Sequence, residues 1–184
     1  MPSPLQILIV EDDPTDAELM VLELQRSEFD FEWQRVDTEV EFLAKLNPGL
    51  NLILSDYKMP NFTGLRALEL LKQQPALDIP FIVVSGSIGE ETAVDVLQHG
   101  AADYLLKDRI ARLGQSVRQA LFQKQLRGER RRAEGASQNQ LQELQRWQEA
   151  MLDREERIIE LKQEVNDLLG QLKQPNRYFN PAEP

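Results

Sequence analysis

Four short apolar runs constrain the fold of this chain more than any other feature of its sequence. Each run is continuous rather than alternating and is rich in Ile, Val and Leu, as strands buried on both faces of a parallel sheet are. The four runs are Leu5–Val10, Leu52–Leu54, Phe81–Val84 and Tyr104–Leu106. A fifth segment, Phe31–Val36, alternates apolar and polar residues, which is typical of a half-exposed edge strand.

Helical patterns lie between these runs and alternate with them. The predicted helices are Pro14–Ser27 after an Asp13 cap, Thr38–Leu46 with a capping box of Thr38 and Glu41, Leu65–Lys72, Glu91–His99, and a fifth from Arg109 with Asp108 as its cap. Five alternations of strand and helix predict an α/β fold, a five-stranded doubly wound parallel sheet. Right-handed crossovers place helices on both faces, and we expect the strand order 2-1-3-4-5.

Polar residues follow the buried strands of this predicted sheet. Ligands bind outside the carboxyl ends of parallel strands, so these residues should meet at one rim. They are Glu11-Asp12-Asp13, Ser55-Asp56, Ser85-Gly86 and Lys107. Three or four carboxylates, a hydroxyl and an ammonium are therefore expected at the same edge.

This set of groups suits phosphoryl chemistry. Clustered carboxylates repel one another unless a cation neutralises them, and an all-oxygen site suits Mg²⁺. One lysine and one serine hydroxyl can hold the remaining oxygens of a phosphoryl group. The only histidine, His99, lies in a predicted helix, so no base–nucleophile pair is evident. The simplest reaction left is attack by a carboxylate on phosphorus, which gives an aspartyl phosphate.

Four stretches together resemble the response regulator receiver family. They are Ile7–Pro14 (ILIVEDDP), Leu52–Pro60 (LILSDYKMP), Phe81–Gly86 (FIVVSG) and Gly100–Lys107 (GAADYLLK), and the resemblance spans roughly residues 4–125. It implies a two-component response regulator that accepts phosphoryl from a histidine kinase or a phosphotransfer protein. It also implies Mg²⁺ as cofactor and no enzymatic activity beyond self-phosphorylation and self-dephosphorylation.

The resemblance assigns a role to each matching residue of the metal site. Asp56 matches the phosphoacceptor, and Asp12 matches the direct metal ligand. Glu11 would act largely through water. The backbone carbonyl of Lys58, two residues after the acceptor, would supply a further ligand. Asp13 is better explained as a helix cap than as a ligand.

The remaining matches concern the phosphoryl oxygens and the switch. Ser85 and Lys107 match the hydroxyl and the lysine that contact those oxygens, and Tyr104 matches the aromatic switch. One residue departs from the family pattern, because Asp108 stands where a proline usually follows the lysine. A cis peptide bond before a non-proline residue costs about 3 kcal/mol, so we expect a trans bond and a different loop there.

The C-terminal part has a different pattern. From Leu144 a heptad repeat emerges, interrupted by Arg154 at one d position. The predicted dimer seam consists of Leu144, Met151, Ile158, Val165 and Leu172 at the a positions and of Trp147, Leu161 and Leu168 at the d positions. We therefore expect a receiver domain at 1–127, a helical coiled-coil arm at 128–174 that forms a parallel homodimer, and a flexible tail at 175–184. A single amphipathic helix packed on the receiver is the alternative for the arm.

Composition narrows the possible functions further. The net charge of −10 argues against nucleic acid as the main partner, and the absence of cysteine excludes disulfides and thiolate sites. No apolar stretch is long enough to span a membrane, and no signal peptide is evident, so we expect a cytoplasmic protein. Two other functions stay open: a degenerate receiver used as a scaffold or dimerisation module, and a Mg²⁺-dependent phosphohydrolase. The second usually needs an acid at the position of Lys58.

Overall fold

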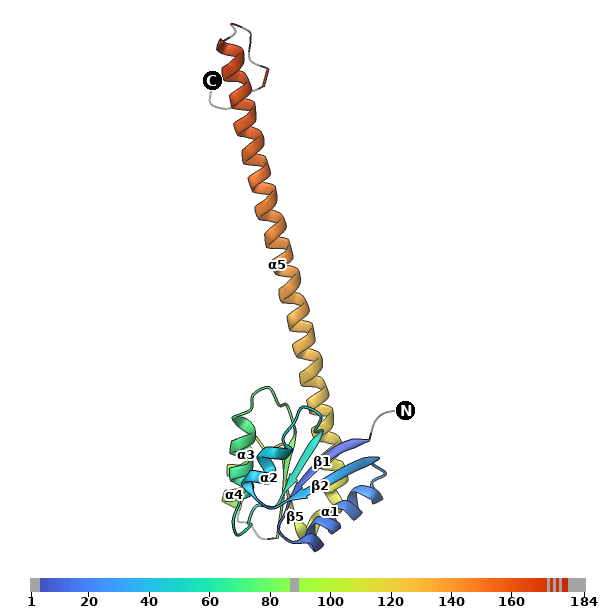
Figure 1. Cartoon of the computed structure of the whole chain (residues 1–184). Coiled ribbons are helices and arrows are strands. Elements are labelled where there is room, and N and C mark those ends of the chain that lie inside the picture. The colour runs from blue at the N-terminus through green and yellow to red at the C-terminus, as the bar shows by residue number, and fades with distance from the viewer. Residues whose placement is uncertain (1–3, 87–89, 172, 174, 176, 179–184) are drawn as a thin grey trace. The chain divides into compact units, whose positions relative to one another are not determined.

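A computed structural model describes residues 4–86, 90–171, 173, 175, 177 and 178, with the side chains of residues 90–92 left out. Its contacts divide the chain into two compact units, Met1–Gly128 and Glu129–Pro184. Among the described residues, every strand lies in the first unit. The second consists mainly of the distal part of one long helix and a short segment that follows it (Figure 1).

The first unit is built on five parallel strands in the order β2-β1-β3-β4-β5, which confirms the predicted topology. The strands are β1 Leu5–Val10, β2 Phe31–Val36, β3 Leu52–Ser55, β4 Phe81–Ser85 and β5 Asp103–Leu106. All residues of β3 and β4 are buried, whereas the middle of the edge strand β2 is exposed. The contrast agrees with the continuous and alternating patterns of the sequence.

Four helices connect successive strands, and a fifth follows the last. Their bounds are α1 Pro14–Arg26, α2 Glu39–Lys45, α3 Gly64–Lys72, α4 Glu90–Gln98 and α5 Leu113–Gln171. Side-chain oxygens cap three of them at the N-terminus, from Asp13, Thr38 and Thr63. These caps satisfy backbone N–H groups that lack helical partners, and the first two were predicted.

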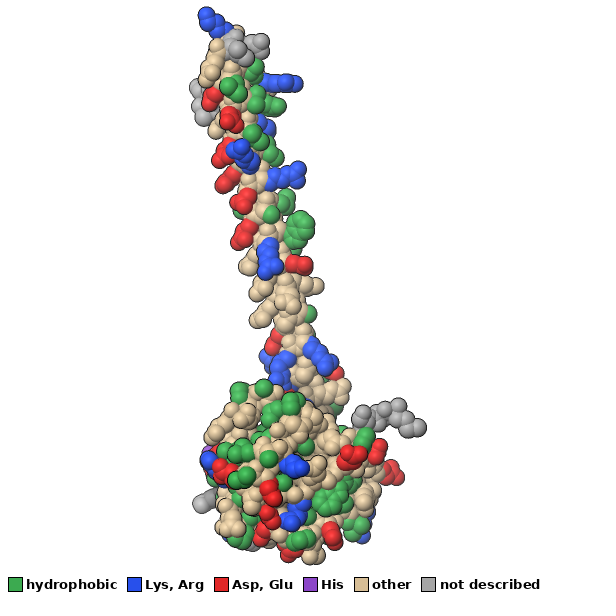
Figure 2. Space-filling view, in the orientation of Figure 1, with side chains coloured by type: hydrophobic (Ala, Val, Ile, Leu, Met, Phe, Trp, Pro, Cys, Tyr) green, Lys and Arg blue, Asp and Glu red, His purple; other side chains and the backbone are tan. Residues whose placement is uncertain are grey.

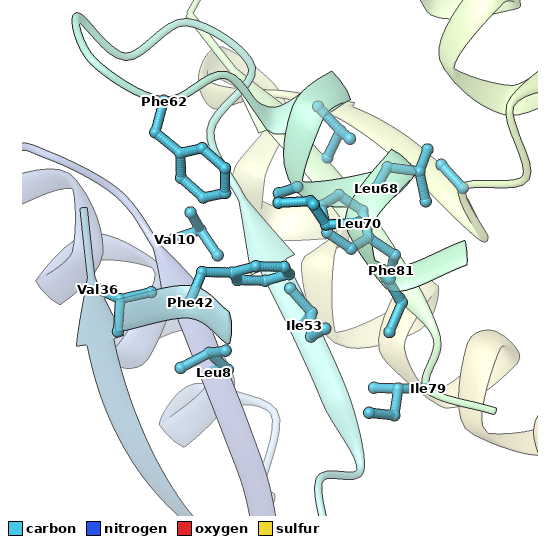
Figure 3. Packing of buried hydrophobic residues seen from close by; sticks show 14 of the residues in the cluster. Leu8, Val10, Val36, Phe42, Ile53, Phe62, Leu68, Leu70, Ile79 and Phe81 are labelled. Carbon is cyan, nitrogen blue, oxygen red and sulfur yellow. The ribbon is translucent and has the colours of Figure 1, made fainter. Parts of the chain in front are cut away.

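The sheet separates two hydrophobic clusters. One cluster contains Phe42 of α2, Leu68 of α3 and Val96 of α4, so these three helices cover one face. Figure 3 shows Phe42 and Leu68 of this cluster with Ile53 of the sheet. The other contains residues of α1 and α5, which cover the opposite face. Neighbouring residues of β1 alternate between the clusters, with Leu8 in the first and Ile9 in the second. Burial on both faces fixes the sheet, and with it the positions of the residues that follow each strand.

The prediction that a helix begins at Arg109 with an Asp108 cap is wrong. A 3₁₀ helix runs from Lys107 to Arg112, without a side-chain cap, and α5 begins only at Leu113. Leu113 is fully buried in the second cluster and Ile110 packs against it, so packing against the sheet decides where the regular helix starts. The peptide bond between Lys107 and Asp108 is trans, as predicted, and no cis bond occurs in the described residues.

In the second unit, most hydrophobic side chains are exposed. Along its helix, green hydrophobic side chains recur at one edge of the view and acidic side chains at the other (Figure 2). Asn166 is buried, and its side chain accepts hydrogen bonds from the backbone N–H groups of Arg177 and Tyr178 and donates one to the Tyr178 carbonyl. Tyr178 lines a groove of about 210 Å³ together with Ile158, Leu161, Lys162 and Val165. Leu172 lies outside the described residues.

Candidate functional site

Three carboxylates meet at the carboxyl ends of β1 and β3. Glu11 and Asp12 follow β1, and Asp56 follows β3. One oxygen of each lies within 4.8 Å of the other two, which is close enough for a shared cation. Glu11 is 1% exposed and Asp56 7%, whereas Asp12 is exposed. The site therefore combines a buried, negatively charged floor with an open acidic side.

The backbone of the sheet holds two of these residues in place. The Glu11 N–H donates to the Val36 carbonyl at 3.0 Å, and the Asp56 N–H donates to the Val10 carbonyl at 2.8 Å. One Asp56 carboxylate oxygen accepts a hydrogen bond from the Tyr57 N–H at 2.6 Å. The other oxygen is left to face the cluster. Strand pairing thus extends one residue beyond each strand and orients the acidic side chains.

Lys107, the residue after β5, places its ammonium among the carboxylates. Nζ lies 3.0 Å from a Glu11 oxygen and 3.4 Å from an Asp56 oxygen, and its shortest contact is to Asp16. Burial of the ammonium acts to lower its pKa, but the hydrogen bonds that Lys107 donates to Asp16 and Glu11, together with the nearby negative charges, outweigh burial. The pKa of Lys107 is therefore raised above its usual value, and the side chain stays charged.

The buried position of Glu11 makes the negative charge of its carboxylate unfavourable. Burial raises the pKa of its carboxyl to about 7, and the charge of Asp56 adds to this effect, while the hydrogen bond from Lys107 opposes it. Burial and the charge of Asp56 together therefore outweigh the stabilising effect of the Lys107 ammonium on the Glu11 carboxylate. A divalent cation beside Glu11 would supply the missing charge.

The other predicted site residues lie around this cluster. Ser85 is buried at the end of β4 and pairs with Leu106, the residue before Lys107. Tyr104 of β5 packs against the first hydrophobic cluster, and its buried hydroxyl has no hydrogen-bond partner among the described residues. Burial raises the pKa of that hydroxyl, with smaller contributions from the charges of Asp108 and Asp56. Lys58 is exposed two residues after Asp56.

The N-cap of α1, Asp13, and one residue of its first turn, Asp16, also lie near the site. Asp13 caps the helix, accepting a hydrogen bond from the Thr15 N–H at 2.8 Å, which confirms the prediction that it is a cap. Asp16 was not predicted, although it makes the shortest contact to Lys107. Its sequence signal was weak, because an acid in the first turn of a helix is common for reasons of the helix dipole alone.

The donor set fits a hard divalent cation. Carboxylate oxygens, with room for water on the exposed Asp12 side, match the coordination that Mg²⁺ prefers, and no sulfur or imidazole ligand is present among the described residues of the cluster. The ammonium of Lys107 contacts the same cluster. The site therefore has carboxylates that can bind a metal cation and, beside them, an ammonium that can bind an anion.

Comparison with known proteins identifies the family. The response regulator receiver domain matches residues 7–118, and the chain belongs to this family. A curated relative is the two-component response regulator ARR2 of Arabidopsis thaliana, 31% identical over 109 residues, a match that covers 58% of this chain and 16% of ARR2. The chain thus spans a small part of the length of that relative.

Two solved structures are similar to the first unit. The signal receiver domain of a signal transduction histidine kinase from Syntrophus aciditrophicus is 32% identical and has a TM-score of 0.53. The superposition covers 63% of this chain and 89% of that one. The Mn²⁺-bound form of the response regulator Rcp1 is 28% identical, with a TM-score of 0.53 covering 62% of this chain and 91% of that one.

The family places the chain in two-component signalling. Receiver domains take phosphoryl groups from histidine kinases or phosphotransfer proteins and are generally not enzymes that turn over a separate substrate. This assignment favours the response regulator over the phosphohydrolase considered from sequence. In the described part of the chain, no helix is long and apolar enough to cross a bilayer.

Proposed function

We propose that this chain is a response regulator that accepts a phosphoryl group on Asp56. The observation that carries the proposal is the meeting of Asp56 with Glu11, Asp12 and Lys107 at one edge of the sheet. Asp56 has one oxygen held by the Tyr57 N–H and a second one 3.4 Å from the Lys107 ammonium. That second oxygen is the candidate nucleophile.

The proposed reaction is a phosphoryl transfer from a histidine kinase or phosphotransfer protein. An Asp56 oxygen bonds to phosphorus as the bond between phosphorus and the donor atom breaks. The electron pair of the broken bond stays on the donor atom, which takes a proton from solvent. Lys107 and the Ser85 hydroxyl would hold the phosphoryl oxygens, and positioned charge of this kind is the main means of catalysis in phosphoryl transfer.

Glu11, Asp12, Asp56 and the carbonyl of Lys58 would hold Mg²⁺. The bound ion would supply positive charge near the phosphoryl oxygens. Glu11, with its pKa raised to about 7 mainly by burial, is the residue that gains most from such a charge. Tyr104 is the proposed switch, since its buried hydroxyl has no hydrogen-bond partner among the described residues and would follow Ser85 toward a phosphoryl group.

The test is phosphorylation by acetyl phosphate and Mg²⁺, followed by intact mass. The wild-type chain should gain one phosphoryl group, and Asp56→Asn should gain none. Asp30→Asn is the matched control, because Asp30 is an exposed aspartate that precedes β2, at the opposite edge of the sheet. If Asp56→Asn is still phosphorylated, the assignment of the acceptor is wrong.

The proposed output is a change in dimer geometry or in partner binding through the C-terminal arm. Its support is the predicted seam, whose described members are between 37 and 68% exposed in the single chain. They are Leu144, Trp147, Met151, Ile158, Leu161, Val165 and Leu168. An apolar stripe of this extent on one helix is the usual signature of association with a second helix. The boundaries of receiver, arm and tail given above, and a cytoplasmic location, belong to the same proposal.

A further inference from the structure

The nearest partner of the Lys107 ammonium comes from a helix and not from a strand end. Nζ lies 3.0 Å from Glu11 and 3.4 Å from Asp56, and closer still to Asp16. The Lys107 side chain is 17% exposed, so its charge is only partly screened by water. Asp56, the group that would carry phosphate, is therefore the most distant of the three carboxylates.

The first turn of α1 places Asp16 at the site. Asp13 caps the helix and Pro14 occupies its first position, so local sequence sets where α1 starts and that Asp16 lies in its first turn. Glu11 and Asp56 each accept a hydrogen bond from a neighbouring backbone N–H, at 3.2 and 2.6 Å. Among the described residues, Lys107 is the group that donates to the Asp16 carboxylate.

An ammonium is a compact charge with three donors, and its attraction for each partner falls with distance. To hold the oxygens of a phosphoryl group on Asp56, Lys107 must move its charge toward its most distant partner. That movement lengthens its shortest contact, the one to Asp16. Asp16 and the phosphoryl group would then compete for the Lys107 ammonium.

We propose that Asp16 is a positioning residue that holds Lys107 against α1 and competes for it with the phosphoryl group on Asp56. The inference rests on the proposed function of Asp56. Asp16 thereby lowers the affinity of the site for a phosphoryl group, and it links occupancy of the site to the first turn of α1. Replacing its carboxylate releases Lys107 toward Asp56.

The experiment is titration with beryllofluoride, a mimic of the phosphoryl group, at saturating Mg²⁺, followed by ¹⁹F NMR or calorimetry. Asp16→Asn should bind beryllofluoride roughly threefold to tenfold more tightly than the wild-type chain, the scale of a partly screened ion pair. Asp16→Ala should match it. Asp13→Asn is the control, because it removes an equal charge three residues away while an asparagine still caps the helix.

A second background separates a direct effect from one that acts through Lys107. In the Lys107→Met background, Asp16→Asn should raise the affinity for beryllofluoride by no more than the control Asp13→Asn does. An equal gain in that background, or a gain no larger than that of Asp13→Asn in the wild type, overturns the inference while leaving the acceptor in place. Failure of the wild-type chain to bind beryllofluoride would instead overturn the proposed function, and this inference with it.

Discussion

The carboxylates of the acidic cluster differ in burial, and this difference separates their roles. Glu11 is buried beneath the cluster and loses hydration, which raises its pKa to about 7. Asp12 is exposed. Its backbone carbonyl accepts a hydrogen bond from the Arg35 guanidinium at 3.4 Å. The fold should therefore depend on the protonation of Glu11 and be indifferent to the side chain of Asp12.

Asp12→Ala should weaken Mg²⁺ binding without destabilising the metal-free fold. Removing one acid from a like-charged cluster lowers cation affinity, by roughly tenfold or more, and relieves repulsion in the apo state. Asp13→Ala should do the reverse, losing about 1 kcal/mol of stability with its cap and little Mg²⁺ affinity. Calorimetric titration and thermal melting in EDTA measure the two effects. A large fall in the melting temperature of Asp12→Ala would identify Asp12 as a structural residue.

Glu11 predicts a pH dependence of stability in the metal-free chain. Its pKa in the folded state, about 7, lies above the value of 4.5 expected when unfolded, so the native state binds the extra proton between these values. The stability that Glu11 contributes is complete below pH 4.5 and is lost as the pH rises through about 7. Glu11→Gln cannot titrate and should flatten this slope in urea denaturation in EDTA. Identical slopes for the two chains would contradict the assigned pKa.

Residues after the strands could be predicted from sequence, because burial of both faces fixes where each strand ends. Glu11, Asp56 and Lys107 follow directly from that rule. Asp16 could not be predicted, since its contact with Lys107 depends on where the first turn of α1 lies relative to the end of β5. Local sequence records the cap at Asp13 but not that distance.

Elements with strong local signals were predicted well, whereas the start of the fifth helix, which depends on packing, was not. The β1 strand was predicted to within a residue, as was α1 with its Asp13 cap. The start of the fifth helix was misplaced because Asp108 resembles an N-cap in sequence. The turn after Lys107 instead follows the burial of Leu113, and Arg109 within it has non-helical backbone angles.

The start of α3 lies so close to Asp56 that a side chain there is predicted to disturb the site. A Cβ on Gly64 would lie 2.4 Å from the Asp56 carbonyl oxygen and 3.1 Å from Tyr57 Cα, and both are backbone atoms. Gly64→Ala should therefore cost roughly 1–3 kcal/mol in urea denaturation and slow phosphorylation of Asp56. Gly135→Ala is the control, because nothing lies within 4 Å of the added Cβ. It should leave stability unchanged or raise it by up to about 1 kcal/mol. Equal stability of the two variants would show that the β3–α3 connection relaxes freely.

At the scale of the whole molecule, the chain combines a packed α/β unit with a helical unit that buries little apolar surface. The first unit has two hydrophobic clusters, one on each face of the sheet. In the second unit the described residues of the predicted seam are exposed, with Tyr178 lying beside Ile158, Leu161 and Val165. A second copy of the chain would cover this stripe, and the pattern of Ile and Val at a with Leu at d favours two strands.

Ile158→Asp should abolish the dimer, because it would bury a charge at the centre of the seam. Light scattering should then give the mass of one chain. Ile159→Asp is the matched control: Ile159 is the next residue, 51% exposed, and lies outside the a and d positions. It should remain a dimer. A dimeric Ile158→Asp, or equal dissociation of the two variants, would remove the coiled coil from the proposal.

Charge alone does not decide whether the two helices of the proposed dimer run parallel or antiparallel. A parallel pair brings Arg157 at g near Lys162 at e of the second copy, a like-charge contact. Arg157 is already paired with Glu160 of its own helix at 2.8 Å, which offsets its charge, and exposed pairs are worth only about 0.2–1 kcal/mol. The apolar seam should therefore prevail and set the chains parallel. Val165→Cys, at the seam, should then cross-link efficiently to its copy, while Ile159→Cys should not. A confirmed dimer in which position 165 fails to cross-link would be antiparallel.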